Sequence, residues 1–173
     1  METLECIKAR ASVRSFRPEP VPEELVSKIL EAAVNAPSAG NVQDWEFVVV
    51  RERSRKKALS EAAYGQGFVS QAPVVIVVCS DLERIFSSYG ERGRDVYSVQ
   101  DSAAAAMALM LAACDLGLGT CWVGAFSEGK VRSLLGLPEN IRPMAIIPLG
   151  YPAKKPRKPG RMELKKVVHS EMY

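Results

Sequence analysis

Two arginines and one serine occupy alternate positions near the start of the chain, in the run Arg10-Ala-Ser12-Val-Arg14. In an extended segment alternate side chains project to the same side, so these three would form one polar patch. Guanidinium and hydroxyl groups bind anions through charge-assisted hydrogen bonds, and the patch is therefore a candidate anion site. Taken alone, the triplet is explained better by a solvated basic turn.

A second candidate is the run PSAGNVQDW over residues 37–45, which joins an expected helix to an expected strand. The side-chain amides of Asn41 and Gln43 each offer donors and acceptors, which suits the edge of a planar heterocycle. Asn and Gly also serve turn geometry, so an ordinary loop explains the same residues.

The third candidate is the glycine-containing run GLGTCWVGAF over residues 117–126. Gly117 and Gly119 are typical of the end of a helix, whereas Gly124 interrupts an expected strand and would let a ligand approach the backbone closely. The sequence contains no Walker-type phosphate loop and no Gly-x-Gly-x-x-Gly after a strand. These features disfavour a nucleoside triphosphatase and a dinucleotide-binding fold.

The composition is that of one globular domain with unevenly placed charge. The 173 residues are 47% hydrophobic and 25% charged, which suffices for a sizeable core and excludes disorder and collagen-like repeats. The net charge is +3, but residues 151–173 hold seven Lys or Arg and two Glu, so the rest of the chain is slightly acidic. Such a basic segment binds nucleic acid or a phosphate-bearing small ligand. Nucleic acid is disfavoured because the segment lacks interleaved aromatics.

The four cysteines and the single histidine form no recognisable metal or redox motif. Cys6, Cys79, Cys114 and Cys121 include no pair with a two-residue gap, and His169 lies near the end of the chain. Cys79 and Cys121 fall in apolar runs, where burial is a better explanation than thiol catalysis. The first residues lack a signal-peptide core, and no apolar run approaches the roughly 18 residues of a membrane span, so we expect a cytoplasmic protein.

Hydrophobic periodicity and turn signals predict an α/β or α+β arrangement. Apolar residues on both parities of the strands predict a sheet covered on both faces. Ser98 and Asp101 stand at capping-box spacing at the start of a long helix, and the polar segment 81–97 before it is expected at the rim of the site. Helices are predicted over residues 3–9, 22–36, 55–63, 99–116 and 128–135, and strands over residues 45–51, 73–80, 120–126 and 144–149.

The long predicted helix contains the alanine-rich run SAAAAMALMLAA. Small side chains on several faces allow neighbouring helices to approach closely. We interpret it as a central helix buried on all sides, in part against a partner subunit. The alternative is a helix that is rich in alanine merely because alanine is the best helix former.

In their order and spacing the three candidates resemble the nitroreductase family of flavoproteins. The match runs through ARASVRSF, EAAVNAPSAGNVQDWEFVVV, QAPVVIVVC, QDSAAAAMALMLAACDLGLGTCWVG and IIPLGYP. The resemblance implies a nitroreductase-like α+β fold, with a central mixed β-sheet flanked by helices. It also implies an intertwined homodimer with one FMN at each of two subunit interfaces, and a single FMN-binding domain over residues 1–173 in which residues 151–173 form a basic C-terminal arm.

The resemblance assigns phosphate and flavin ligands at both ends of the chain. Arg10, Ser12 and Arg14 correspond to the N-terminal FMN-binding set, with Arg10 at the phosphate and Arg14 near the pyrimidine edge of the flavin. Arg161 occupies the place of the C-terminal phosphate ligand. Lys158 is the alternative, because the spacing in GYPAKKPRKPG is loose.

Two further segments are assigned by the same resemblance. Val123 and Gly124 correspond to the segment that passes near flavin N5, where a backbone N–H can face the reactive atom. The loop that reaches the cofactor from the other subunit corresponds to Pro37, Ser38, Ala39, Asn41 and Gln43.

In terms of activity, the resemblance implies an FMN-dependent NAD(P)H oxidoreductase. NADH or NADPH would deliver hydride to flavin N5, and a nitroaromatic, quinone or similar acceptor would then take electrons at the same face in a ping-pong cycle. No general base is required, and we identify no catalytic side chain and no metal ligand. Arg14 is the candidate cation for the negative charge that builds near N1 and O2 of the flavin. A reductase or dehalogenase for another acceptor, and a non-catalytic FMN-binding sensor or carrier, stay open as alternatives.

Overall fold

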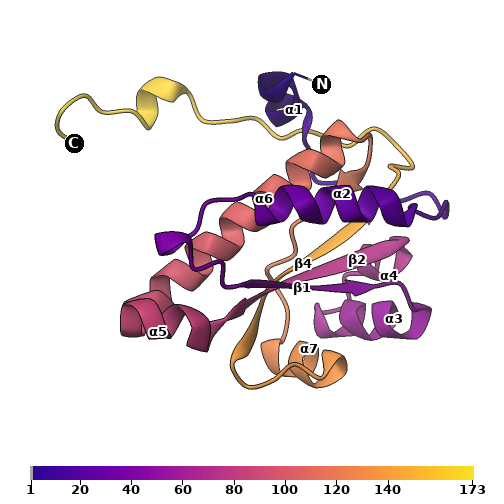
Figure 1. Ribbon diagram of the computed structural model, residues 1–173. Helices are drawn as coiled ribbons and strands as arrows, with labels where there is room; N and C mark the ends of the chain where they lie inside the picture. The colour runs from indigo at the N-terminus through magenta and orange to yellow at the C-terminus, as the bar shows by residue number, and fades with distance from the viewer. Residues whose placement is uncertain (1) are drawn as a thin grey trace.

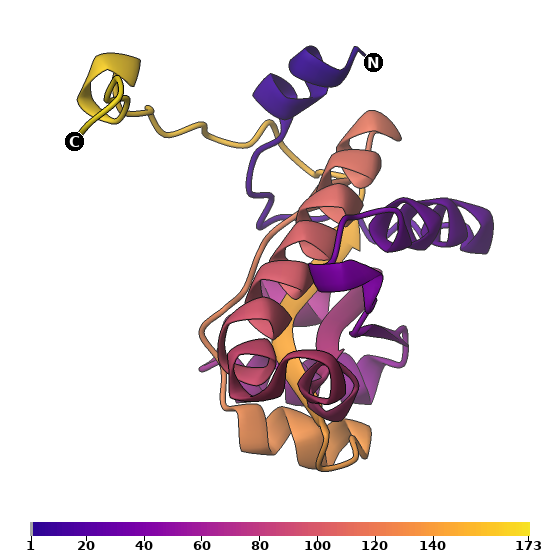
Figure 2. The ribbon, with the colours of Figure 1, turned by 60° about the vertical axis from the view of Figure 1, so that its left-hand side comes forward.

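A computed structural model describes residues 2–173 (Figures 1 and 2). A four-stranded sheet lies between layers of helices. The strands are β1 (Trp45–Val50), β2 (Val74–Asp81), β3 (Gly119–Thr120) and β4 (Ile141–Gly150). The helical elements are α1 (Thr3–Ala9), α2 (Glu23–Val34), η1 (Ala39–Asn41), α3 (Arg53–Ala62), α4 (Phe68–Gln71), α5 (Leu82–Arg92), η2 (Gly93–Tyr97), α6 (Ser98–Asp115), α7 (Glu128–Leu135) and η3 (Leu164–Lys166).

The strands pair antiparallel in the order β1-β2-β4-β3. In the central pairs Val77 lies opposite Val48 of β1 and Ile146 of β4. One parallel contact is added at the β3 edge, where Ser12 forms an isolated bridge with Thr120. The predicted α+β arrangement is confirmed, and the parallel part of the predicted mixed sheet consists of this bridge.

The two faces of the sheet are covered by different helices, as the apolar strands predicted. Val74, Ile76 and Val78 pack in one cluster with α2 and α6. Val75 and Val77 point the other way and pack with α3, α4 and α7. Successive side chains of a strand face opposite sides, so a strand that is apolar throughout becomes fully buried only between two such layers.

Helix α6 crosses the sheet and is buried on one face only. Ala105, Ala106 and Leu109 are fully buried, whereas Val99 and Met107 are 48% and 46% exposed. Within residues 2–173 of one chain no element covers this side of the helix, so the expected burial on all sides would need the partner subunit and stays a prediction. By length and composition the run Leu82–Asp115 would suffice to cross a membrane, a test that the core helix of a soluble protein also passes.

The predicted capping box at Ser98 is wrong. The chain is already helical upstream, because α5 and η2 occupy residues 82–97 and lead directly into α6. The Ser98 hydroxyl donates to the Arg94 carbonyl at 2.6 Å, and the Asp101 carboxylate accepts from the Ala39 backbone instead of capping a helix. A cap satisfies the free N–H groups of a first turn, and no first turn exists at this point.

The strand predicted over residues 120–126 is also largely wrong. β3 ends at Thr120, and the chain regains the sheet only at Val123, through a single bridge with Ile146 of β4. Between and after these points Trp122 and Gly124 are exposed. This segment lies at the edge of the sheet, where no further strand completes a ladder.

Residues 151–173 form an arm that leaves the sheet. Its start is fixed by hydrogen bonds from the Arg17 N–H to the Tyr151 carbonyl at 2.8 Å and from the Ala153 N–H to the Ser15 carbonyl at 2.9 Å. Beyond this point the arm passes α1 and extends away from the body to the C-terminus (Figures 1 and 2). From residue 157 on, its side chains are exposed.

Candidate functional site

The N-terminal anion candidate lies beside β3 in an extended conformation. Ser12 bridges Thr120, and the Val13 N–H donates to the Thr120 carbonyl at 2.9 Å. A Cβ atom on Gly119 would lie 2.6 Å from Cγ2 of Val13, so this close approach requires glycine. The alternation that was predicted to gather Arg10, Ser12 and Arg14 therefore rests on a real extended segment.

Four cationic residues from two distant parts of the chain line one hollow. The hollow has a volume of about 310 Å³, and its lining includes Lys8, Arg10, Lys158 and Arg161. The Lys158 ammonium donates to the Lys8 carbonyl, and Nη1 of Arg161 donates to the Pro159 carbonyl at 3.0 Å. Both candidates for a C-terminal phosphate ligand thus share the hollow with Arg10.

Two thiols near these cations remain protonated at neutral pH. Burial raises the pKa of Cys121, and the charges of Arg14 and Arg10 oppose this rise. Burial likewise raises the pKa of Cys114, while Arg10 and Lys158 lower it. A thiol with a raised pKa is a poor nucleophile, which agrees with the interpretation of Cys121 as a buried small hydrophobe.

The segment predicted to pass near a reactive atom offers one free amide. The Val123 N–H donates to the Ile146 carbonyl at 3.0 Å, and the Ile146 N–H donates to the Val123 carbonyl at 3.0 Å. The N–H group of Gly124 donates to no acceptor in residues 2–173. The guanidinium carbon of Arg14 lies 5.9 Å from the centre of the Phe68 ring. Of the two predicted residues, Gly124 therefore has the available donor.

The second group of predicted residues forms a compact loop between α2 and β1. The Asn41 N–H donates to the Ser38 carbonyl at 3.0 Å, and the Gln43 N–H donates to the Ser38 hydroxyl at 3.0 Å. The Gln43 side-chain amide also donates to Oδ1 of Asn41 at 3.2 Å. Gly40, Asn41 and Gln43 have φ values of 54°, 58° and 55°, which is left-handed backbone. Pro37 at the start of the loop is exposed.

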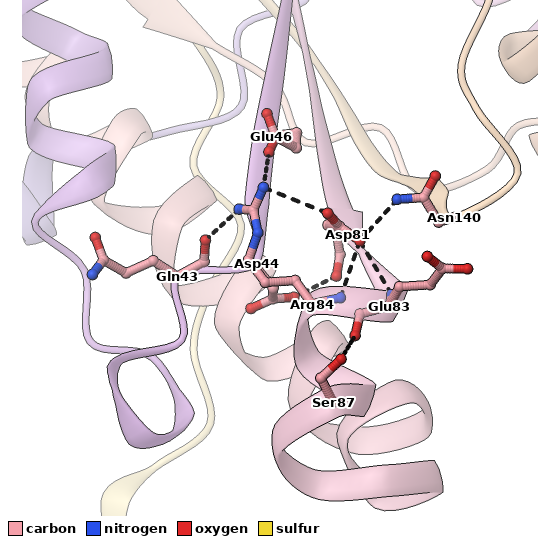
Figure 3. A network of polar contacts seen from close by, with 9 residues as sticks. Gln43, Asp44, Glu46, Asp81, Glu83, Arg84, Ser87 and Asn140 are labelled. Atoms are coloured by element: carbon pink, nitrogen blue, oxygen red, sulfur yellow. Dashed lines mark hydrogen bonds and ion pairs between the residues drawn. The ribbon is translucent and has the colours of Figure 1, made fainter.

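This loop is tied to the protein body at several points. Both carboxylate oxygens of Asp101 in α6 accept from the Ala39 N–H, at 3.1 and 3.0 Å. At the other end Nη1 of Arg84 in α5 donates to the Gln43 carbonyl at 2.8 Å, while Nη2 pairs with Glu46 (Figure 3). Arg84 in turn is placed by the first turn of α5, whose N-cap Asp81 accepts the N–H of Arg84 at 3.1 Å.

The two groups of predicted residues lie near opposite ends of α6. Asp101, which holds the loop, and Cys114, which lies near Arg10 and Lys158, are separated by about 20 Å along the helix at a rise of about 1.5 Å per residue. Within one chain, therefore, the cations and the loop 37–43 do not enclose a common ligand. The role of the loop at a site on the other subunit stays a prediction.

Sequence reasoning missed the residues that hold the loop. Asp101 was taken as a helix cap, and Arg84 and Tyr89 lay in a segment treated only as a polar rim. Tyr89 fixes the loop by contact, because a Cβ atom on Gly40 would lie 2.1 Å from its hydroxyl oxygen. The available signal was Asp44, an acidic residue directly before the expected strand that begins at Trp45.

Asp44 is a buried carboxyl group facing a second one. It is fully buried, Oδ2 accepts from the Ser80 hydroxyl, and Oδ1 has no hydrogen-bond partner. Burial raises the pKa of Asp44 to about 6, with the neighbouring Asp101 adding to the rise and Ser80 opposing it. In residues 2–173 no group of three or more His, Cys, Asp or Glu side chains is arranged to hold a metal ion.

The sequence matches the pattern of the nitroreductase family over residues 7–67 and 52–151. It is 41% identical over 163 residues to a putative NADH dehydrogenase/NAD(P)H nitroreductase of Methanothermobacter thermautotrophicus, covering 90% of this chain and 80% of the relative. It is also 32% identical over 185 residues to the NAD(P)H-dependent FMN reductase of Bacillus subtilis, covering 99% of this chain and 74% of that protein.

The fold is shared with solved structures of similar sequence. The NADPH:FMN oxidoreductase from Vibrio harveyi, determined in complex with NAD+, superposes with a TM-score of 0.91 at 30% identity, over 99% of this chain and 77% of that one. A nitroreductase family protein from Streptococcus pneumoniae gives a TM-score of 0.90 at 29% identity, over 98% of this chain and the whole of the other. The likeness therefore extends over both groups of predicted residues.

Proposed function

The chain belongs to the nitroreductase family, and on this premise we propose that it is an FMN-dependent oxidoreductase that takes electrons from NAD(P)H. We further propose that it passes them to a nitroaromatic, quinone or similar acceptor in a ping-pong cycle. The observation that carries the proposal is the hollow shared by Arg10, Lys158 and Arg161, which suits the phosphate of FMN. The names of relatives, among them an FMN reductase and an NADPH-flavin oxidoreductase, support the same choice of cofactor.

The chemistry of the hollow fits a phosphate monoester. Guanidinium and ammonium groups bind phosphate through charge-assisted hydrogen bonds, and the hollow combines both kinds. Its volume of about 310 Å³ accommodates a phosphate with part of a ribityl chain but no whole flavin. The ring system would then lie along the segment that carries Ser12, Arg14 and Gly124.

We propose that two copies of the chain complete the site. A second copy would bring its own loop 37–43 to the cations and the Gly124 N–H of the first. Apolar side chains left exposed on α1, α6 and the arm favour such an assembly, because burial against a second copy would remove their apolar surface from water. These side chains are Leu4, Ile7, Val99, Met107, Met162, Leu164, Val167 and Val168.

The chain contributes binding and electrostatics to the reaction. FMN, when bound, supplies the redox chemistry by accepting hydride at N5 and passing electrons to an acceptor. Arg14 would place a cation at the pyrimidine edge of the ring and stabilise the negative charge that builds there. The Gly124 N–H would donate a hydrogen bond toward the reactive edge of the ring. Asp44 and Asp101 are buried, so the scheme assigns neither of them a proton transfer to substrate.

The experiment that tests this function is the visible absorbance of the purified protein, repeated after anaerobic addition of NADH and then of NADPH. A flavin spectrum that bleaches, and returns when a quinone is added, is the expected result. A flavin spectrum that stays oxidised with both nicotinamides would favour an FMN-binding sensor or carrier. A protein that cannot be reconstituted with FMN would contradict the proposal.

A further inference from the structure

The loop 37–43 has a backbone conformation that its surroundings must enforce. Asn41 and Gln43 have φ values of 58° and 55°, and residues with a side chain adopt this left-handed geometry only at a cost. The hydrogen bonds within the loop do not fix its position on the protein. At its first turn that position is set by Asp101, whose two carboxylate oxygens accept from the Ala39 N–H.

Asp101 is paired with a second buried carboxyl group. Asp101 is close enough to Asp44 to raise its pKa, and the two side chains are 5% and 0% exposed. Oδ1 of Asp44 has no donor, while Oδ2 already accepts from Ser80. Two ionised carboxylates in this position would repel each other across a dry environment. A proton on Oδ1 of Asp44 replaces the repulsion with a hydrogen bond to Asp101, so that Oδ1 gains a partner.

We propose that Asp101 and Asp44 are positioning residues for the cofactor: one proton shared between their carboxyl groups lets Asp101 hold the Ala39 N–H and thereby fixes the loop 37–43 against FMN. The inference rests on the proposed function, since it takes the loop to contact FMN. It adds two residues that touch neither cofactor nor substrate, and it makes the fit of the loop depend on one proton.

The surroundings of the pair explain why the proton stays. Ser80 of β2 is the neutral donor on Asp44, Ser102 of α6 is buried without a partner, and Tyr97 lines the same cavity as Asp101. None of these three is a cation. The charged groups in this region, Arg84, Glu46, Asp81 and Arg92, are engaged with one another, with the Gln43 carbonyl or with Tyr97.

Ionisation of the pair should therefore loosen the loop. Burial raises the pKa of Asp44 to about 6, so Asp44 loses its proton as the pH rises through that value. The hydrogen bond between the carboxyl groups is then lost, and Asp101 is repelled from the position in which it accepts from Ala39. Asp44→Asn keeps a donor at this position at every pH, because an amide does not titrate.

The test compares the Kd for FMN of the wild type and of Asp44→Asn at pH 5 and pH 8, by flavin fluorescence. The FMN phosphate itself titrates near pH 6, so the informative quantity is the ratio of the two Kd values at each pH. We expect the Kd of the wild type divided by the Kd of Asp44→Asn to be about 1 at pH 5 and about 5 at pH 8. A factor of this size corresponds to one modest hydrogen bond. An equal ratio at both pH values would overturn the proposal.

Variants of Asp101 separate positioning from mere packing. Asp101→Ala removes the acceptor, and we expect the Kd for FMN to rise about tenfold at pH 5. Asp101→Asn retains one oxygen for the Ala39 N–H and should recover most of this loss. If Asp101→Asn binds FMN as weakly as Asp101→Ala, the hydrogen bond to Ala39 does not account for the loss of affinity, and the positioning role of Asp101 is refuted. The matched control is Asp95→Asn, which removes an exposed carboxylate of η2 and should leave the pH dependence of the wild type unchanged.

Hydrogen exchange of the Ala39 amide provides a readout that does not require FMN. In the protein as purified, and after correction for intrinsic exchange, its protection should fall from pH 5 to pH 8 in the wild type and stay constant in Asp44→Asn. Protection that is equal in the two proteins at pH 8 would refute the shared proton. If no variant binds FMN, the proposed function fails, and this exchange experiment still decides whether the carboxyl pair holds the loop.

Discussion

The two ends of α6 carry the two halves of the proposed cofactor site, and their physical construction is opposite. Near Cys114 the functional groups are the cations Arg10, Lys158 and Arg161, which are partly or fully exposed and come from the residue after α1 and from the C-terminal arm. Near Asp101 the polar groups are buried carboxyls, and they act on the backbone of a loop rather than on a ligand.

The two halves should therefore respond differently to changes in ionic strength, side-chain shape and protonation. Exposed cations attract an anion over a distance, so their exact geometry matters little and salt weakens them. A buried carboxyl pair acts through short contacts in a dry environment, so small changes in shape or protonation have large effects there. We therefore expect the cation end to respond to ionic strength and the carboxyl end to respond to pH.

Removal of residues 154–173 should give the largest effect and tests the cation end. The truncated chain lacks both Lys158 and Arg161, and we expect the Kd for FMN to rise about 100-fold, since two charge-assisted hydrogen bonds are lost. Fluorescence titration at low and high salt measures this, and the difference between truncated and full-length protein should shrink at high salt.

Single variants sharpen the result of the truncation. Lys158→Ala and Arg161→Ala decide which of the two cations holds the phosphate. Lys165→Ala is the matched control, because Lys165 lies farther along the arm and pairs with Glu163. A truncated protein that keeps its affinity for FMN and loses affinity for RNA or DNA would contradict the role given to the arm.

At the carboxyl end, Asp44→Asn should stabilise the protein at pH 8. The pKa of Asp44 is raised from 3.8 to about 6 in the folded protein, so wild-type stability falls as the pH rises between these values and stays lower above them. An asparagine avoids this loss, and we expect the free energy of unfolding to rise by about 1–3 kcal/mol at pH 8. Denaturant unfolding at pH 4 and pH 8 measures the effect; an equal gain at both would argue against a raised pKa.

Gly40→Ala should disturb the loop 37–43 at the carboxyl end through a steric clash. The residue has a φ of 54°, and its Cβ atom would lie 2.1 Å from the Tyr89 hydroxyl oxygen. We expect a loss of about 1–2 kcal/mol in the free energy of unfolding, because the strain adds to a forced displacement of Tyr89. In Gly129→Ala, the control, the new methyl group meets open space within α7, and stability should hold or rise. If both variants lose the same free energy of unfolding, the contact with Tyr89 does not account for the effect of Gly40→Ala.

The smallest effect is expected from Arg14→Gln, which leaves the phosphate cations in place. Loss of a positive charge beside the pyrimidine edge should lower the two-electron midpoint potential of bound flavin by about 20–30 mV. Spectroelectrochemical titration of the flavin-loaded protein measures it. Arg17→Gln is the control, because the Arg17 guanidinium lies over the Tyr151 ring and pairs with Glu19. An unchanged potential in the Arg14 variant would contradict the assignment.

Local signals in the sequence predicted much of this molecule. The amphipathic pattern around Ile29 gave α2, and the apolar runs that contain Val77 and Ile146 gave the central strands with a helix layer on each face. The order of motifs identified the family. The resemblance, rather than any local pattern, assigned Arg10 and either Arg161 or Lys158 as phosphate ligands, and this assignment stays a prediction. These features depend on periodicity and on the order of residue types, which one sequence displays in full.

Other features depend on contacts between residues far apart in the chain. Asp101 was read as a cap for α6, whereas it accepts from Ala39, 62 residues earlier. The long helix is covered on one face by its own chain, and whether a partner covers the other face cannot be read from the pattern of one sequence. The length of α6 keeps the loop 37–43 away from the cations, and folding alone brings Asp44 beside Asp101. The sequence by itself determined which groups are available to bind FMN; only the tertiary structure decided which of them meet, because partners and protonation depend on distance and burial in space.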